Sequence, residues 1–170
     1  MIVWIEQALV LAVHDRQLAE HGGSAGVRDE GLLESALARP QQLHAYGDPA
    51  PDLADLAASL AGGLARNHPF VDGNKRTAHV AYRTFLELNG AELVATDEDK
   101  YLAMLALAEG KLSEPDFAAW LRERVRTRGR CEAHEPRPGY RVKARAAGRR
   151  RRPLRTPKRP LKGQTRLSGR

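Results

Sequence analysis

The sequence predicts an all-α protein, and three observations support this. Hydrophobic residues make up 42% of the chain but aromatic residues only 5%. Small aliphatic residues must therefore form most of the core, which favours helices over a β-sandwich. Capping and turn residues separate several segments of helical periodicity. The clearest of these segments carries Leu53, Leu56, Ala57, Leu60 and Leu64. We therefore expect a compact helical bundle.

The first two helices are expected on either side of a glycine pair. An apolar stripe over residues 3–20 predicts the first helix, and Gly22-Gly23 would end it. Asp29 is a suitable N-cap for a second, short helix, which Pro40 would terminate. Residues 40–51 contain three prolines and a glycine, so we expect an irregular arm there and consider it a candidate for docking a target.

The second half of the bundle begins with a helix capped by Asp52. Another helix is expected from Asn74 to about Leu88, before Asn89-Gly90. The only strand material that we expect is short, around residues 92–95.

Two more helices complete the predicted bundle. Thr96 and Asp99 resemble a capping box at the start of the first. Ser113, with Pro115 just inside, would begin the last helix, whose apolar face includes Val125. No internal repeat is evident.

Charge divides the chain into two parts. Residues 137–170 hold 14 of the 28 lysines and arginines and no acidic residue. Residues 1–136 hold the other 14 and all 21 acidic residues, a formal net charge of −7. Apolar periodicity ends near residue 132. We therefore expect a folded domain at 1–131 and a disordered, Arg/Pro-rich tail at 132–170.

Cysteine content and hydropathy indicate a cytoplasmic protein without a membrane partner. The single cysteine, Cys131, excludes an intrachain disulfide and fits a reducing compartment. The apolar run at residues 8–13 is short and lacks a preceding basic segment, unlike a secretory signal. No stretch reaches the roughly 20 apolar residues that span a bilayer.

One segment, residues 68–77, contains the parts of a phosphate-binding site. It joins two predicted helices, and its end forms the first turn of the second helix. Free N–H groups and the helix dipole bind anions at such a terminus. The turn supplies an amide from Asn74 and cations from Lys75 and Arg76, and Gly73 would allow close approach of a phosphate.

The same segment offers a base and a metal ligand. His68 belongs to the residue type best suited to accept a proton near neutral pH, and Asp72 is a hard oxygen ligand for Mg²⁺. Phe70 is expected to be a core anchor. These residues also have ordinary explanations, because Asp-Gly-Asn is common in turns and Lys-Arg is common on solvated helix ends. A zinc site and a P-loop are not indicated.

The segment from His68 to Arg76 resembles the Fic/Doc signature H-x-F-x-(D/E)-G-N-G-R. It is closest to the Doc branch, in which lysine replaces the second glycine, as Lys75 does here. The resemblance extends over roughly residues 5–125. It includes His14-Asp15, His21-Gly22-Gly23, Arg28-Asp29, Leu32–Ala36, Arg39-Pro40-Gln41 and Phe85-Leu86-x-x-Asn89-Gly90.

The resemblance implies a helical bundle that binds ATP at this loop. His68 would activate a hydroxyl group of a target protein, and Asp72 would hold Mg²⁺. Gly73, Asn74, Lys75 and Arg76 would hold phosphates, and Phe70 would anchor the loop. Such proteins are toxins of toxin–antitoxin systems, so a cognate antitoxin is an expected partner.

The reaction that the resemblance implies depends on the branch. Fic proteins transfer AMP to a protein hydroxyl. Doc proteins are described as transferring the γ-phosphate to elongation factor Tu, which blocks translation. Lys75 favours the kinase reaction on a Thr/Ser hydroxyl of a similar target, with AMP transfer as the alternative. His79 stands where the full Fic pattern has another arginine, which also favours the Doc branch.

Inhibition is expected to come from a separate antitoxin. Self-inhibited Fic proteins carry S/T-x-x-x-E-G/N, but Gly26 and Leu105 precede the two Glu-Gly pairs at the critical position. A second alternative is a non-catalytic binding protein whose basic tail contacts nucleic acid. We expect the tail to be a solvated, dispensable extension, and weak, non-specific contact with RNA through its phosphates is the alternative. Its single aromatic residue, Tyr140, does not support recognition by base stacking.

Overall fold

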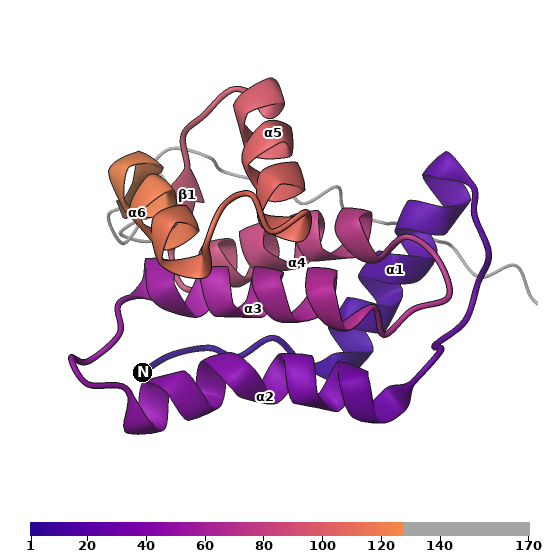
Figure 1. The fold of residues 1–170 in the computed structure, drawn as a ribbon, viewed down its shortest axis with the longest axis horizontal. Coiled ribbons are helices and arrows are strands. Elements are labelled where there is room, and N and C mark those ends of the chain that lie inside the picture. Colours follow the sequence, from indigo (N-terminus) through magenta and orange to yellow (C-terminus); the bar gives the residue numbers. More distant parts are fainter. Residues whose placement is uncertain (128–170) are drawn as a thin grey trace, which may run out of the picture. The chain divides into compact units, whose positions relative to one another are not determined.

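The computed structural model describes residues 1–127. Within this range the chain forms six helices and a two-stranded sheet, which confirms the all-α prediction (Figure 1). The predicted tail at 132–170 and its boundary lie outside the described residues. None of the helices at positions 1–127 has the length and apolar character needed to cross a bilayer.

The predicted N-caps are confirmed. In each of four helices the capping side chain accepts a backbone N–H three residues further on: Asp29, Asp52, Thr96 and Ser113. The helices are α1 (Gln7–His21), α2 (Glu30–Tyr46), α3 (Leu53–Asn67), α4 (Asn74–Leu88), α5 (Asp97–Ala108) and α6 (Glu114–Arg124). The strands are β1 (Ala91–Leu93) and β2 (Val125–Thr127).

Helix α3 is the centre of the fold. Eleven of its 15 residues are buried, and α2, α4 and α6 pack around it (Figure 1). Small residues permit this close packing. A Cβ added to Gly63 would lie 3.2 Å from the backbone of Ala36 in α2. Because α3 ends directly before His68, the most buried helix among residues 1–127 carries one side of the candidate site.

The prediction that Pro40 ends the second helix is wrong. Pro40 is buried inside α2, and the helix continues to Tyr46. An internal proline costs about 3 kcal/mol because it removes one backbone hydrogen bond and crowds the preceding turn. Tertiary packing outweighs this cost: Leu43 packs against the core and the His44 ring contacts Trp4. The irregular arm is therefore limited to the connection between α2 and α3, instead of residues 40–51.

Two predicted boundaries also differ from the structure. The first helix begins only at Gln7, after Glu6 in an extended conformation, and the backbone of Val3 instead exchanges two hydrogen bonds with the Asn89 side chain, of 2.8 and 2.9 Å. Val125 belongs to β2 and pairs with Leu93 of β1, whereas we expected it on the last helix. The predicted strand at 92–95 is observed at Ala91–Leu93, and β2 was not predicted.

Candidate active site

The loop between α3 and α4 carries the signature residues and is closed by Asn74. The Asn74 amide accepts the Phe70 N–H at 2.8 Å and donates to the Phe70 carbonyl at 2.9 Å. Phe70 is 1% exposed, which agrees with its predicted role as an anchor. His68 ends α3 in the left-handed conformation, with φ of 49°, and its side chain is exposed. The side chain of Asn74 thus shapes the loop, and its role in phosphate binding stays a prediction.

The N-terminus of α4 is suited to binding an anion. Gly73 precedes it in the left-handed conformation, with φ of 73°, and no side chain caps the helix. The first helical hydrogen bond runs from the Thr77 N–H to the Gly73 carbonyl, at 2.9 Å. The N–H groups before Thr77 therefore lie at the positive end of the helix dipole, where phosphates bind favourably.

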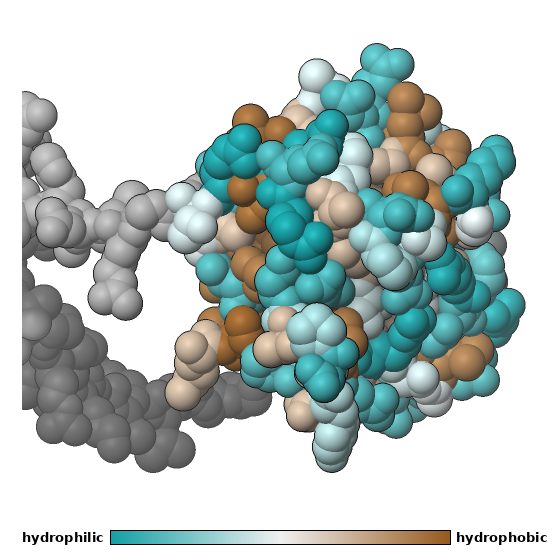
Figure 2. Space-filling model, turned by 60° about the vertical axis from the view of Figure 1, so that its left-hand side comes forward, coloured by the Kyte–Doolittle hydropathy of each residue, from teal (hydrophilic) through white to brown (hydrophobic). Residues whose placement is uncertain are grey.

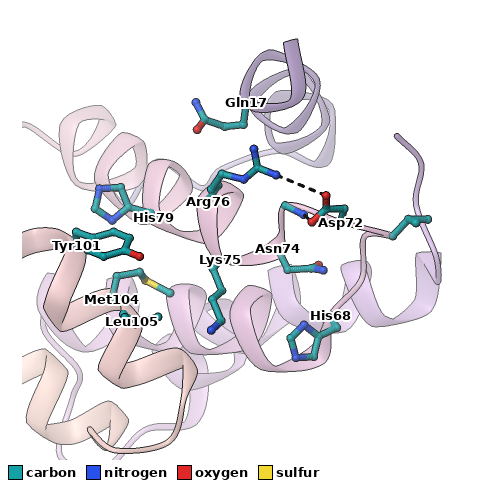
Figure 3. Close-up of a pocket in the computed structure, with 12 residues that line it drawn as sticks. Gln17, His68, Asp72, Asn74, Lys75, Arg76, His79, Tyr101, Met104 and Leu105 are labelled. Atoms are coloured by element: carbon teal, nitrogen blue, oxygen red, sulfur yellow. Dashed lines mark hydrogen bonds and ion pairs between the residues drawn. The ribbon is translucent and has the colours of Figure 1, made fainter. Parts of the chain in front are cut away.

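A pocket of about 460 Å³ lies over this helix end. This volume is typical of a small-molecule site. Figure 3 shows His68, Asp72 and Asn74 at one side and Lys75 in the middle. The opposite side is formed by Tyr101, Met104 and Leu105 of α5 together with His79. The pocket thus has a polar end at the signature loop and a more apolar end at α5.

Arg76 and Asp72 are both held against the end of α1. The Arg76 guanidinium donates to the Gly22 carbonyl at 2.9 Å, and its other nitrogen lies 3.7 Å from the Asp72 carboxylate. The second Asp72 oxygen accepts the Gly73 N–H at 2.6 Å. Gly23 lies so close that an added Cβ would be 2.5 Å from Asp72. The Gly22-Gly23 turn therefore fixes the charged side chains of the anion site.

Lys75 is directed towards the turn between α5 and α6. Its ammonium lies 3.9 Å from the Glu109 carboxylate, which also pairs with Lys111 at 2.8 Å. The hydrogen bond and charge of Lys111 lower the pKa of Glu109. The Lys75 side chain remains 48% exposed, so its ammonium is accessible to a bound anion.

His79 cannot replace the charge of the arginine found in the full Fic pattern. Burial, with smaller contributions from Arg83 and Lys100, lowers the pKa of His79 to about 4. The imidazole is therefore neutral at neutral pH. It adds a flat, uncharged wall to the α5 end of the pocket.

His14 is a site residue to which sequence reasoning assigned no role. It is 2% exposed, stacks on Phe70 and lies within hydrogen-bonding distance of Thr77. The only signal in the sequence was the His14-Asp15 pair within the resemblance. That pair indicated neither the burial of His14 nor its contact with the signature loop.

The pocket offers few carboxylates that could bind a metal ion. No cluster of three or more His, Cys, Asp or Glu suited to a metal occurs within residues 1–127. Asp72 is the acidic residue of the pocket wall, and its side chain is 51% exposed. A single accessible carboxylate fits Mg²⁺ bound mainly through phosphate oxygens and water, which is the usual mode for this ion.

These features define a class of protein: a helical bundle with a pocket at an uncapped helix N-terminus that is suited to anions, and with a histidine beside it. The model of the Fic/DOC family matches residues 4–86. The toxin Doc of Mycolicibacterium smegmatis is 57% identical over 75 residues, which cover 44% of this chain and 57% of that toxin. The protein kinase doc of Escherichia phage P1 is 34% identical over 113 residues, covering 66% of this chain and 88% of the kinase.

The chain belongs to the Fic/Doc family, and within it to the Doc-type toxins.

Proposed function

We propose that this protein is a toxin kinase that transfers the γ-phosphate of ATP to a Thr or Ser hydroxyl of a translation protein. Two similarities support it: one relative is named a toxin and another a protein kinase. The target would resemble elongation factor Tu, and a cognate antitoxin would inhibit the enzyme in the cytoplasm.

The position of Lys75 is the observation that carries the proposal. Lys75 lies between the apolar wall at α5 and the His68 side of the pocket (Figure 3). A nucleobase would bind against the flat, uncharged wall, and its phosphates would follow the cations along the first turn of α4. The terminal phosphate would then lie nearest His68. A glycine at position 75 would leave the middle of this path without a charge.

The residues of the site would divide the reaction between them. His68 would accept the proton of the target hydroxyl. The hydroxyl oxygen would bond to the γ-phosphorus as the bond from that phosphorus to the β–γ bridging oxygen breaks, releasing ADP. Lys75, Arg76 and the N–H groups of α4 would stabilise charge on the phosphate oxygens. Asp72 would hold Mg²⁺, which would neutralise further phosphate charge.

The test is a transfer assay in bacterial lysate with ATP labelled at the α- or the γ-phosphate. Wild-type protein would be compared with His68→Ala. Label from the γ-position alone, lost in the variant, is the expected result. Label from the α-position would show AMP transfer and contradict the kinase reaction. No label that depends on His68 would favour a binding protein.

A second variant tests the role assigned to Lys75. Lys75→Gly restores the glycine of the Fic pattern and removes the central cation. We expect γ-transfer to fall at least tenfold, because one phosphate contact is lost at the site of charge development. Arg16→Gly is a suitable control, since Arg16 is an exposed cation on α1 whose partner is Glu20.

A further inference from the structure

His14 connects α1 to both halves of the signature. Its ring stacks on Phe70 with centroids 3.9 Å apart and planes 11° from parallel. Its Nδ1 lies 3.1 Å from the Thr77 hydroxyl in the first turn of α4. One buried side chain therefore contacts the loop before the anion site and the helix that follows it.

The same part of α1 also supports the turn at Gly73. A Cβ added at Gly73 would lie 3.5 Å from Leu18 and 3.6 Å from Cε1 of His14. Four residues separate these two side chains, so they lie on one face of the helix. The His14 ring thus lies close behind the turn that carries Asp72 and Arg76.

One ring nitrogen of His14, Nε2, has a cost in folding free energy. Within the described residues, the buried Nε2 has no hydrogen-bond partner. Burial is also the main reason that the pKa of His14 is lowered. A phenylalanine would keep the stacking and remove the unpaired Nε2, although the buried Thr77 hydroxyl would lose its His14 partner. Unpaired polar atoms in native cores call for an explanation. Packing accounts for a ring at position 14, but not for an imidazole.

We propose that His14 is a positioning residue of the transfer reaction. Its hydrogen bond to Thr77 and its stacking on Phe70 hold the turn from Asp72 to Arg76 in the geometry that orients the phosphates towards His68. The inference rests on the proposed function and extends it to a residue on another helix. The unpaired Nε2 is the stability cost of this positioning, a common compromise at functional sites.

The test compares His14→Phe, Thr77→Val and the double variant. His14→Phe should unfold at nearly the same temperature, because it removes the unpaired Nε2 but also takes away the His14 partner of the buried Thr77 hydroxyl. Thr77→Val should unfold at a lower temperature, because it leaves both ring nitrogens unpaired. All three variants should lose kcat by about tenfold, with little change in KM for ATP, since small misplacements at a reacting centre are costly. The double variant should be no slower than either single one.

Hydrogen exchange gives a readout that needs no nucleotide. The Val71 N–H donates to the Gly26 carbonyl at 3.0 Å, and the Phe70 N–H donates to Asn74. Both amides should exchange faster in His14→Phe and Thr77→Val. Val10→Ala is the control: Val10 is fully buried in the same helix, so this change should lower stability while the His14 ring keeps its Phe70 and Thr77 partners.

Three results would overturn the inference. The first is that His14→Phe keeps the kcat and the amide exchange rates of the wild type. The second is that the losses of kcat in the two single variants add up in the double variant. The third is that each variant loses kcat only in proportion to its drop in unfolding temperature, as Val10→Ala does. If wild-type protein shows no γ-transfer, the proposed function fails. The exchange of the two amides then still decides whether His14 orders the loop.

Discussion

Gly23 lies where the backbone itself touches the charged groups of the anion site. A Cβ there would be 2.5 Å from Asp72, 2.9 Å from Leu18 and 3.1 Å from Arg76, and φ is +129°. Gly23→Ala should therefore displace both charged side chains and strain the backbone by about 1–3 kcal/mol. We expect ATP affinity, measured by calorimetry, to fall about tenfold, since one charge-assisted contact would be lost.

Gly22→Ala separates the effect of backbone strain from the effect of a steric clash between the added Cβ and the charged side chains. Gly22 also has a positive φ, +73°, but no atom lies within 4 Å of an added Cβ. This variant should lose some stability and retain ATP affinity within about twofold, because Asp72 and Arg76 are not displaced. Equal losses of affinity in the two variants would show that the close approach at Gly23 is unimportant.

His79 should make stability depend on pH below neutrality. Burial lowers its pKa to about 4 in the folded protein, below the value of about 6.5 expected in the unfolded chain. The unfolded chain therefore binds the proton more readily. The stability that neutral His79 permits is complete above about pH 6.5 and is lost progressively as the pH falls towards 4.

His79→Leu isolates this effect in thermal unfolding between pH 4 and 7. The variant removes the titrating group but leaves the carboxylates of the protein to titrate as before. The difference in unfolding temperature between variant and wild type should grow as the pH falls below 6.5. A constant difference would contradict the lowered pKa of His79.

At this scale the sequence predicted the signature-loop end of the pocket, but neither its wall at α5 nor the contacts that hold the residues in place. His68, Asp72, Gly73, Lys75 and Arg76 all line the pocket, as the contiguous signature suggested. The contact of Lys75 with Glu109 joins distant segments. The same is true of the contact between His14 and Phe70, and local periodicity contains no information about such pairs.

At the scale of elements, the contact of α2 with α3 depends on small residues. A Cβ at Gly63 would lie 3.2 Å from Cα and from the carbonyl oxygen of Ala36, which are backbone atoms and cannot rotate away. Gly63→Ala should lower stability by about 1–3 kcal/mol through overpacking, although alanine is the better helix former. Thermal or urea unfolding measures the change.

Gly31→Ala is the matched change on an exposed helical position. An added Cβ there meets only the tip of the Asp29 carboxylate, at 3.3 Å. It should stabilise the protein or leave it unchanged, because the gain in helix propensity is not opposed by backbone contact. A stabilising effect of Gly63→Ala would mean that the two helices separate easily.

Elements were predictable where local signals decide them. Each predicted cap at Asp29, Asp52, Thr96 and Ser113 begins a helix, because capping is a short-range interaction. Pro40 was misleading because core packing further along α2 outweighs its local cost. Strand β2 was missed because its pairing with β1 joins segments far apart in the sequence.

At the scale of the whole molecule, the chain consists of an acidic segment followed by a strongly basic one. Figure 2 shows a face on which hydrophilic side chains predominate and hydrophobic ones lie in small groups between them. Residues 1–131 contain 14 basic and 19 acidic residues, a formal net charge of −5. Residues 137–170 add 14 positive charges and no negative one. Attraction to a polyanion is therefore expected only from the basic segment, residues 137–170.

Deleting residues 132–170 tests this division. The full chain should bind RNA at about 50 mM salt and release it by about 200 mM, because binding that neutralises many phosphates weakens steeply with salt. The shortened chain, with its negative net charge, should bind at neither concentration, as measured by fluorescence anisotropy with a labelled single strand. Changing Arg149–Arg152 to glutamine in the full chain should weaken binding and reduce its salt dependence.

The shortened chain should have the same unfolding temperature and the same phosphate transfer as the full chain, because the described helices and the pocket lie within residues 1–127. A shortened chain that loses transfer would show that the tail belongs to the catalytic machinery.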